Sequence, residues 1–162
     1  MPELPEVEVS RRGLEPFLCG RTVVAATLRT PRLRNEIPAD LDTRLPGLPL
    51  LAIRRRGKYL LFDFGCGQLL LHLGMSGSLR LVPPGTPPQK HDHFDLGFAD
   101  TVMRFRDPRR FGVLDWIDGD VTDRPLGAES DYYLSLATPY EPPNGPLDSL
   151  DDLLLVRGVD EP

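Results

Sequence analysis

Cysteine is scarce in this sequence. Its 162 residues include two, Cys19 and Cys66, which are too few for a disulfide framework or a four-cysteine metal site. We therefore interpret both as reduced thiols. Long apolar runs are also missing, because none approaches the about 18 residues that a membrane span needs, so no membrane partner is expected. The acidic start of the chain lacks the basic and then apolar build of a signal peptide, which predicts a cytoplasmic protein.

Basic residues are almost missing from the C-terminal segment. Residues 116–162 hold 2 Lys or Arg against 11 Asp or Glu, a net charge of −9, whereas residues 1–115 hold 17 against 13, a net charge of +4. This asymmetry indicates a mildly basic body with an acidic tail. The overall charge of −5 argues against nucleic-acid binding, but local clusters, not net charge, form a phosphate-binding footprint. Two basic clusters lie at 54–58 and 104–110, although arginine runs alone are more often solvated strand faces.

The residue pattern predicts a mainly β fold with some α. Pro5 and Glu6 suit the first turn of a helix over 5–18, where a missing N–H is harmless and the dipole favours negative charge. The pattern then changes to short β-rich runs, and the predicted strands are 22–29, 49–56, 58–64, 68–73, 78–82, 93–98, 101–106 and 111–117. Many short strands at close spacing are typical of a β-sandwich. We therefore expect a two-sheet β-sandwich with an N-terminal helix.

One domain, residues 1–118, should hold the core. In its sixth predicted strand Phe94, Leu96 and Phe98 alternate and so share one face. Beyond residue 118 this pattern fades, and the segment 119–162 is acidic and rich in proline. We expect that segment to be a loosely ordered tail.

The N-terminus carries the first group of chemical interest. Removal of Met1, expected because proline is small, leaves Pro2 with a secondary α-amino group. The unperturbed pKa of an α-amino group is about 7.7–8.0, so a useful fraction is nucleophilic at neutral pH. Such an amine can attack a sugar C1′, displace a base and hold the sugar as a cationic iminium, while Glu3 beside it can move protons. The alternative is that these residues merely start a helix, and the short motif alone does not decide between the two.

Two glycine-flanked turns present side chains of a second kind. Met75 lies at the tip of the turn 72–77, and a methionine on an exposed turn suits a wedge between stacked bases. The turn 107–112 presents a cation and an aromatic ring together, so Arg109 could replace a lost base's partner and Phe111 could wedge beside it. Each turn also has a plain structural interpretation, as a core methionine at a strand end and as a salt-bridged hairpin.

Lysine and histidine supply the remaining candidates. Lys58 follows Gly57 at the start of a predicted strand, where an exposed lysine is the commoner case. The pair His91 and His93 could share a strand face and suggest a metal site, but no cysteine or further histidine stands near in sequence, and two imidazoles are a weak signal. We therefore predict no metal site and assign phosphate or hydrogen-bond roles to these histidines.

Five motifs together resemble those of one family, the bacterial formamidopyrimidine-DNA glycosylases. The resemblance covers roughly residues 1–118, and five separate motifs in the same order and spacing make chance agreement very improbable. The motifs are Pro2-Glu3-Leu4-Pro5-Glu6-Val7-Glu8, Arg56-Gly57-Lys58-Tyr59, His72-Leu73-Gly74-Met75-Ser76-Gly77, Lys90-His91-Asp92-His93 and Asp107-Pro108-Arg109-Arg110-Phe111-Gly112.

The resemblance implies a two-helix β-sandwich domain and a function in base-excision repair. The expected reaction is removal of oxidised purines, such as 8-oxoguanine and formamidopyrimidines, from damaged double-stranded DNA, with associated AP lyase strand cleavage. By match to the family's motifs, Pro2 is the nucleophile and Glu3 the general acid and base. Lys58 contacts phosphate and assists catalysis, and His72 is also a DNA backbone contact.

The same resemblance assigns DNA-binding roles to the two turns. Met75, Arg109 and Phe111 fill the gap left when the damaged nucleotide flips out of the stack, and His91 is placed among the DNA-binding residues. The family's second half, with its helix–two-turn–helix element and four-cysteine zinc finger, has no counterpart in this sequence. We therefore expect no cofactor in this chain, and we expect a monomer.

Three functional classes remain open on the sequence. The first is a DNA glycosylase with lyase activity, impaired by the missing half. The second is a non-enzymatic damaged-DNA-binding remnant or pseudoenzyme, which would keep Met75, Arg109 and Phe111 without turnover. The third is a β-sandwich interaction module whose acidic tail mimics DNA, and the Pro2–Glu3 pair argues against it because folding does not require that pair.

Overall fold

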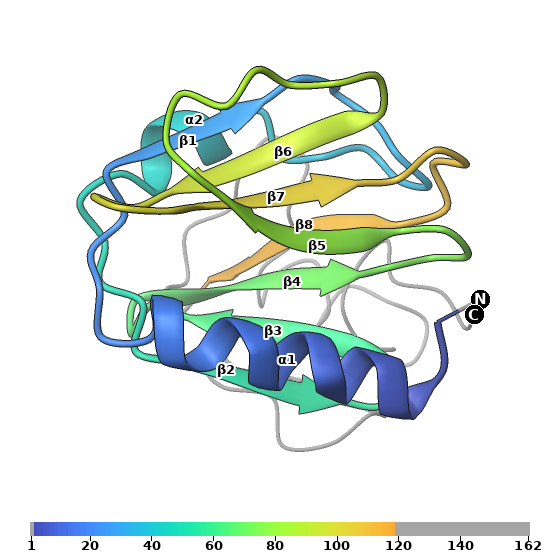
Figure 1. Cartoon of the computed structure of the whole chain (residues 1–162), viewed down its shortest axis with the longest axis horizontal. Helices are drawn as coiled ribbons and strands as arrows, with labels where there is room; N and C mark the ends of the chain where they lie inside the picture. The colour runs from blue at the N-terminus through green and yellow to red at the C-terminus, as the bar shows by residue number, and fades with distance from the viewer. Residues whose placement is uncertain (1, 119–162) are drawn as a thin grey trace, which may run out of the picture.

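Two four-stranded antiparallel sheets, stacked face to face, form the body of the molecule (Figure 1). The computed structural model describes residues 2–118, and the predicted tail, 119–162, lies outside them. One sheet has the strand order β1-β6-β7-β5 and the other β2-β3-β4-β8. The elements are α1 (Leu4–Leu18), β1 (Ala25–Leu28), α2 (Leu41–Arg44), β2 (Ala52–Arg56), β3 (Tyr59–Asp63), β4 (Gly67–His72), β5 (Ser78–Val82), β6 (Asp92–Gly97), β7 (Val102–Arg106) and β8 (Val113–Asp118).

The core lies between the sheets, and it confirms the predicted sandwich with an N-terminal helix. Phe62, Phe94 and Phe105 are fully buried, and Leu96 lies on the same face as Phe94, as the alternation predicts. The opposite face of β6 is buried too, because Arg104 of β7 donates to both carboxylate oxygens of Asp95. An ion pair therefore buries part of the outer face of this sheet, where the alternation of residues alone would predict solvent-exposed side chains.

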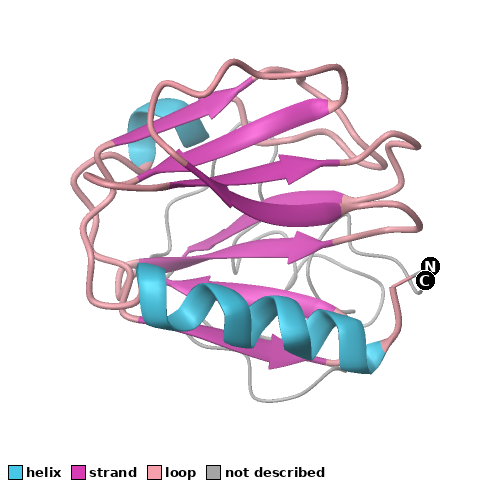
Figure 2. Cartoon of the chain, viewed as in Figure 1, coloured by secondary structure: helices cyan, strands magenta, loops and turns pink. Residues whose placement is uncertain are grey.

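Helix α1 lies across β2 and β3 (Figure 2). Its buried side chains are Val7, Leu14 and Leu18, which join the main core. The helix continues through Pro16, although an interior proline costs about 3 kcal/mol. Burial of the two leucines on either side of that proline offsets the loss. Within residues 2–118, no helix has both the length and the apolar character needed to cross a membrane.

Several element boundaries differ from the predicted ones. The first strand begins at Ala25 rather than at residue 22, because Thr22 forms only an isolated bridge with Pro49. Helix α2 was not predicted from the residue pattern, although the family resemblance implies a second helix. It is stabilised by the fully buried Leu41 and by Arg44, whose guanidinium donates to Asp40 at 2.8 Å.

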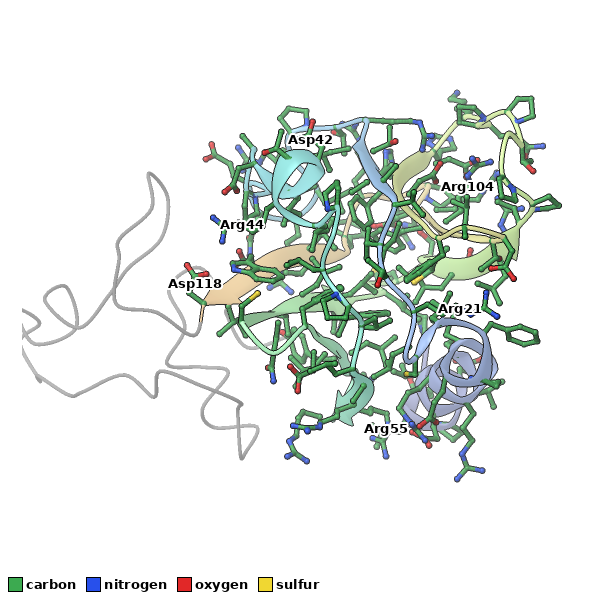
Figure 3. The ribbon with its side chains drawn as sticks, turned by 90° about the vertical axis from the view of Figure 1, so that its left-hand side faces the viewer. Arg21, Asp42, Arg44, Arg55, Arg104 and Asp118 are labelled. Carbon is green, nitrogen blue, oxygen red and sulfur yellow. The ribbon has the colours of Figure 1, made fainter. Side chains whose placement is uncertain are left out.

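One end of the sandwich, which we call the far end, is closed by contacts between α2 and β8. Arg44 lies 3.5 Å from the Asp118 carboxylate and 5.5 Å from the centre of the Trp116 ring (Figure 3). None of the candidate site residues belongs to this end.

The opposite end, which we call the site end, brings five separate chain segments together. In the second sheet the register pairs Tyr59 with His72 and His72 with Val113. In the first sheet it pairs Arg106 with both Ser78 and Asp92. The start of α1 and the β2–β3, β4–β5 and β7–β8 turns therefore meet there with the start of β6, as Figure 1 shows at its right-hand side. Every candidate residue predicted from the sequence comes from one of these five segments.

Candidate active site

The start of α1 and the β2–β3 turn form what we call the N-terminal corner, made of Pro2, Glu3 and Lys58. The Lys58 ammonium nitrogen lies 3.4 Å from the Glu3 Oε2 atom. The Glu3 backbone N–H donates to the Glu6 carboxylate at 2.6 Å, which fixes the backbone next to partly exposed Pro2. The structure thus brings together the three residues that the sequence nominated for catalysis. Their chemical roles remain predictions.

A charged bridge ties this corner to the underlying strand. The Arg55 guanidinium donates from Nε to Glu8 of α1 at 2.9 Å and from Nη1 to the Gly57 carbonyl at 3.0 Å (Figure 3). Hydrogen bonds from Arg11 and then Arg55 lower the pKa of Glu8 from its ordinary 4.5 to about 2. The bridge therefore links the helix directly to the turn that carries Lys58. Sequence reasoning missed it because Arg55 lies 47 residues from Glu8.

His72 combines burial with an unused polar atom. The residue is 5% exposed, and its ring tilts against Tyr59 with a centroid separation of 4.7 Å. Nδ1 accepts a hydrogen bond from the Gly74 N–H at 2.9 Å, which leaves the proton of the neutral ring on Nε2. Burial first, and then the charges of Arg34 and Lys58, lower the pKa of His72. Within residues 2–118 its buried Nε2 has no hydrogen-bond partner, which is unusual because buried polar atoms are nearly always hydrogen-bonded.

The two turns that hold the predicted wedge lie against each other, and we call them the paired turns (73–77 and 107–112). A Cβ built on Gly74 would lie 2.4 Å from the Phe111 carbonyl carbon. Met75 and Phe111 are 42% and 43% exposed, and the Arg109 guanidinium stands 5.3 Å from the centre of the Phe111 ring. Two apolar side chains and one cation therefore project from a single place at the site end.

A third segment, 29–37, supports the paired turns, and sequence reasoning did not nominate it. Arg110 donates to the buried Thr30 hydroxyl at 3.0 Å, and the Arg34 N–H donates to the Gly112 carbonyl at 3.1 Å. The exposed Arg34 side chain adds positive charge close to His72. No sequence motif links segments so far apart in the chain, so the contribution of 29–37 to the site becomes visible only in the folded structure.

The two histidines of the predicted pair differ in environment. His91 precedes β6 with a positive φ of 72°, whereas His93 is 6% exposed and its Nε2 lies 2.9 Å from the Asp107 carbonyl. His91 lies outside β6 and a register shift falls between Asp92 and Phe94, but the two rings still lie near each other, with centroids 6.3 Å apart in an edge-to-face arrangement. In the described part of the chain, no group of three or more His, Cys, Asp or Glu side chains could hold a metal ion.

A family model described as the formamidopyrimidine-DNA glycosylase N-terminal domain matches residues 1–114. The chain belongs to this glycosylase family. Among relatives, the formamidopyrimidine-DNA glycosylase of Dechloromonas aromatica is 58% identical over 125 residues, which are 74% of this chain and 44% of that protein. The Thiobacillus denitrificans protein of the same name is 60% identical over 115 residues, or 70% of this chain and 43% of that one.

A solved structure gives the same result for the fold. The Lactococcus lactis formamidopyrimidine-DNA glycosylase, non-covalently bound to DNA containing an AP site, superimposes with a TM-score of 0.67 at 38% identity. The match covers 72% of this chain and 45% of that one. The chain thus spans a little under half the length of the relatives it matches.

The C-terminal part of the chain resembles a different family. A model described as type II secretion system (T2SS), protein K, matches residues 109–162. The two family matches overlap only at the β7–β8 turn and the start of β8. The match to the glycosylase family model ends at residue 114, close to residue 118, where the described part of the chain ends.

Proposed function

We propose that this chain carries the base-removal chemistry of a DNA glycosylase, acting on oxidised purines in double-stranded DNA with associated AP lyase cleavage. One observation carries the proposal. The N-terminal corner, with Lys58 3.4 Å from Glu3, lies at the same end of the sandwich as the exposed side chains of the paired turns. A group that can attack a sugar and a group that can fill a gap in stacked bases thus lie at the same end of the molecule.

The corner supplies a nucleophile and a proton carrier. Once Met1 is removed, the Pro2 nitrogen attacks C1′ and passes its proton to the Glu3 carboxylate, while the base leaves with the electron pair of the glycosidic bond and takes a proton from water. Glu3 donates a proton to the sugar ring oxygen as the ring opens, and the nitrogen then forms an iminium with C1′. The iminium acidifies the C2′ hydrogen, so loss of that proton expels the 3′ phosphate and cuts the strand.

Lys58 and His72 supply anion contacts beside that reaction. The ammonium of Lys58 is a point charge for a phosphate oxygen. The Nε2–H of His72 is a neutral donor without a partner among the described residues, and DNA binding would have to expose it because it is buried. His91 stands at the start of β6 on the same end, and we assign it a DNA backbone contact as well. Such contacts hold the strand in register but carry no sequence information.

The paired turns supply the gap filler. A base within the stack is shielded from attack at C1′, so the nucleotide must leave the duplex before reaction. Met75 and Phe111 are apolar and exposed, and Arg109 can bond to the base left without a partner. Wedges of this kind stabilise a kinked duplex in other DNA-binding proteins. The AP-site DNA bound by the Lactococcus lactis relative supports this assignment.

Borohydride trapping with the full chain tests the proposal. The protein is mixed with a duplex containing 8-oxoguanine, borohydride is added, and covalent adducts are measured by intact mass together with the N-terminal residue. We expect an adduct on protein that begins at Pro2, and strong loss of adduct in Pro2→Gly. Glu3→Gln should lower base release. An adduct of undiminished yield in both variants would remove these residues from the chemistry, and binding without any adduct would favour a DNA-binding protein that lacks turnover.

A further inference from the structure

Asp107 stands at the centre of the paired turns, and none of the proposed reaction steps uses it. Its residue is completely buried. One carboxylate oxygen, Oδ1, accepts a hydrogen bond from the Ser76 hydroxyl at 2.9 Å, and the other, Oδ2, accepts one from the Gly112 N–H at 2.7 Å. A single buried side chain therefore bonds to the β4–β5 turn on one side and closes the β7–β8 turn on the other.

Ser76 extends this connection to Arg109, which carries the cation of the paired turns. Its hydroxyl oxygen accepts a hydrogen bond from the Arg109 N–H at 3.1 Å while the same hydroxyl donates to Asp107. Met75 is the neighbour of Ser76, and Phe111 is the neighbour of Gly112. Arg109 is therefore itself bonded to the Asp107 network, and Met75 and Phe111 are each next in sequence to a residue that is bonded to it.

The backbone of Asp107 joins the network to β6. Its N–H donates to the His91 carbonyl at 3.0 Å, and its carbonyl oxygen lies 2.9 Å from Nε2 of buried His93. The carboxylate is therefore held in place from the first sheet. It cannot follow one turn without displacing the other, because buried groups that lose their hydrogen bonds are strongly disfavoured.

We propose that Asp107 and Ser76 are positioning residues that hold Met75, Arg109 and Phe111 together as one preformed wedge. This inference rests on the proposed function, because it assigns the wedge its use on a duplex with a vacated position. A wedge fixed before binding does not lose conformational freedom when it enters the stack, so binding to a gap is tighter than for a mobile one. The connection does not contribute to contacts with an intact duplex, where the wedge has no space to enter.

The first experiment measures affinity of the full chain for two duplexes by fluorescence anisotropy. One duplex contains a tetrahydrofuran abasic analogue, and the other has the same sequence intact. Ser76→Ala should lower affinity for the abasic duplex about fivefold, the value expected for one lost hydrogen bond, and leave the intact duplex unchanged. Ser76→Thr keeps the hydroxyl and should restore the wild-type ratio.

The matched control is Ser78→Ala, a change of the same kind two residues further on. Ser78 is exposed and lies outside the Asp107 network, so both affinities should stay at wild-type values. Equal losses on the two duplexes for Ser76→Ala, or an equal effect of Ser78→Ala, would overturn the proposal. Asp107→Asn is a second test, because its one amide oxygen must replace two acceptors, and it should lower the same ratio.

A second experiment needs no DNA. Hydrogen exchange of the peptide covering 105–112 should be faster in Ser76→Ala than in wild type, because the Arg109 N–H loses its acceptor, and it should be unchanged in Ser78→Ala. Unchanged exchange in Ser76→Ala would overturn the connection itself. If wild-type protein shows no preference for the abasic duplex while exchange responds as expected, the proposed function is wrong and the connection between the turns stands.

Discussion

Charged side chains near the surface hold the N-terminal corner, whereas a buried carboxylate holds the paired turns. The Arg55–Glu8 bridge joins partly exposed groups, and water and salt weaken pairs of that kind. Asp107 is completely buried, and its carboxylate accepts hydrogen bonds from one hydroxyl and one backbone N–H, which salt screens much less. We infer that the corner can adjust as chemistry proceeds, while the turns keep one shape.

The close approach of the paired turns gives the largest expected effect. Gly74 has φ +64°, and a Cβ there would lie 2.4 Å from the Phe111 carbonyl carbon and 2.5 Å from the Gly112 nitrogen. Gly74→Ala should therefore lower the free energy of unfolding by about 3 kcal/mol, from backbone strain together with a clash. Urea denaturation followed by tryptophan fluorescence measures it.

Gly85→Ala is the matched control for that change. Gly85 has a similar left-handed backbone, φ +84°, but a Cβ there meets nothing within 4 Å. It should lose only about 1 kcal/mol, the cost of the conformation alone. If both variants lose the same free energy, the turns are not held by close backbone contact, and the contrast with the corner disappears.

The outline of this molecule follows from its sequence because burial leaves a periodic pattern. Phe94 and Leu96 alternate with Asp95, and the alternation gave the core face of β6 correctly. Motif spacing likewise nominated Lys58 and Glu3 together, and the structure places their charged groups 3.4 Å apart. Properties that repeat along the chain, or that a family shares as a motif, are therefore available before the fold is known.

Contacts between single distant side chains leave no such pattern. The Ser76–Asp107 hydrogen bond joins residues 31 apart, and Arg110 reaches across the fold in the same way to donate to the Thr30 hydroxyl. The same limit applies to α2, where one buried leucine and one Asp–Arg pair stabilise a turn too short for helical periodicity to register. These features depend on how the sheets stack, so they become visible only in three dimensions.

A smaller effect is expected at the corner. Arg55→Ala removes the bond to Glu8 and the bond to the Gly57 carbonyl, so Lys58 should be held less well against Glu3. The rate of borohydride-trapped adduct at saturating DNA should fall about threefold, as for loss of a partly exposed pair, with little change in DNA affinity. The control is Arg12→Ala, which also loses a bond to Glu8 but lies on the exposed side of α1. Equal rates for the two variants would show that the bridge does not position Lys58.

The smallest expected effect is the pH dependence that Glu8 contributes next to the corner. The pKa of Glu8 lies at about 2 in the folded protein, below its ordinary 4.5, so the folded state binds fewer protons than the unfolded state between these values. The stability supplied by this carboxylate is therefore fully present above about pH 4.5 and is lost as pH falls through about 2. Glu8→Gln cannot titrate, so its deficit in unfolding free energy should be greatest above pH 4.5 and should shrink toward pH 2.

Urea denaturation across that range measures this deficit, with Asp42→Asn at the far end of the sandwich (Figure 3) as control. A deficit that stays constant with pH would mean that Glu8 stabilises the corner by its shape rather than by its charge. The contrast would then not hold between a corner joined by ion pairs and turns joined by hydrogen bonds from uncharged donors.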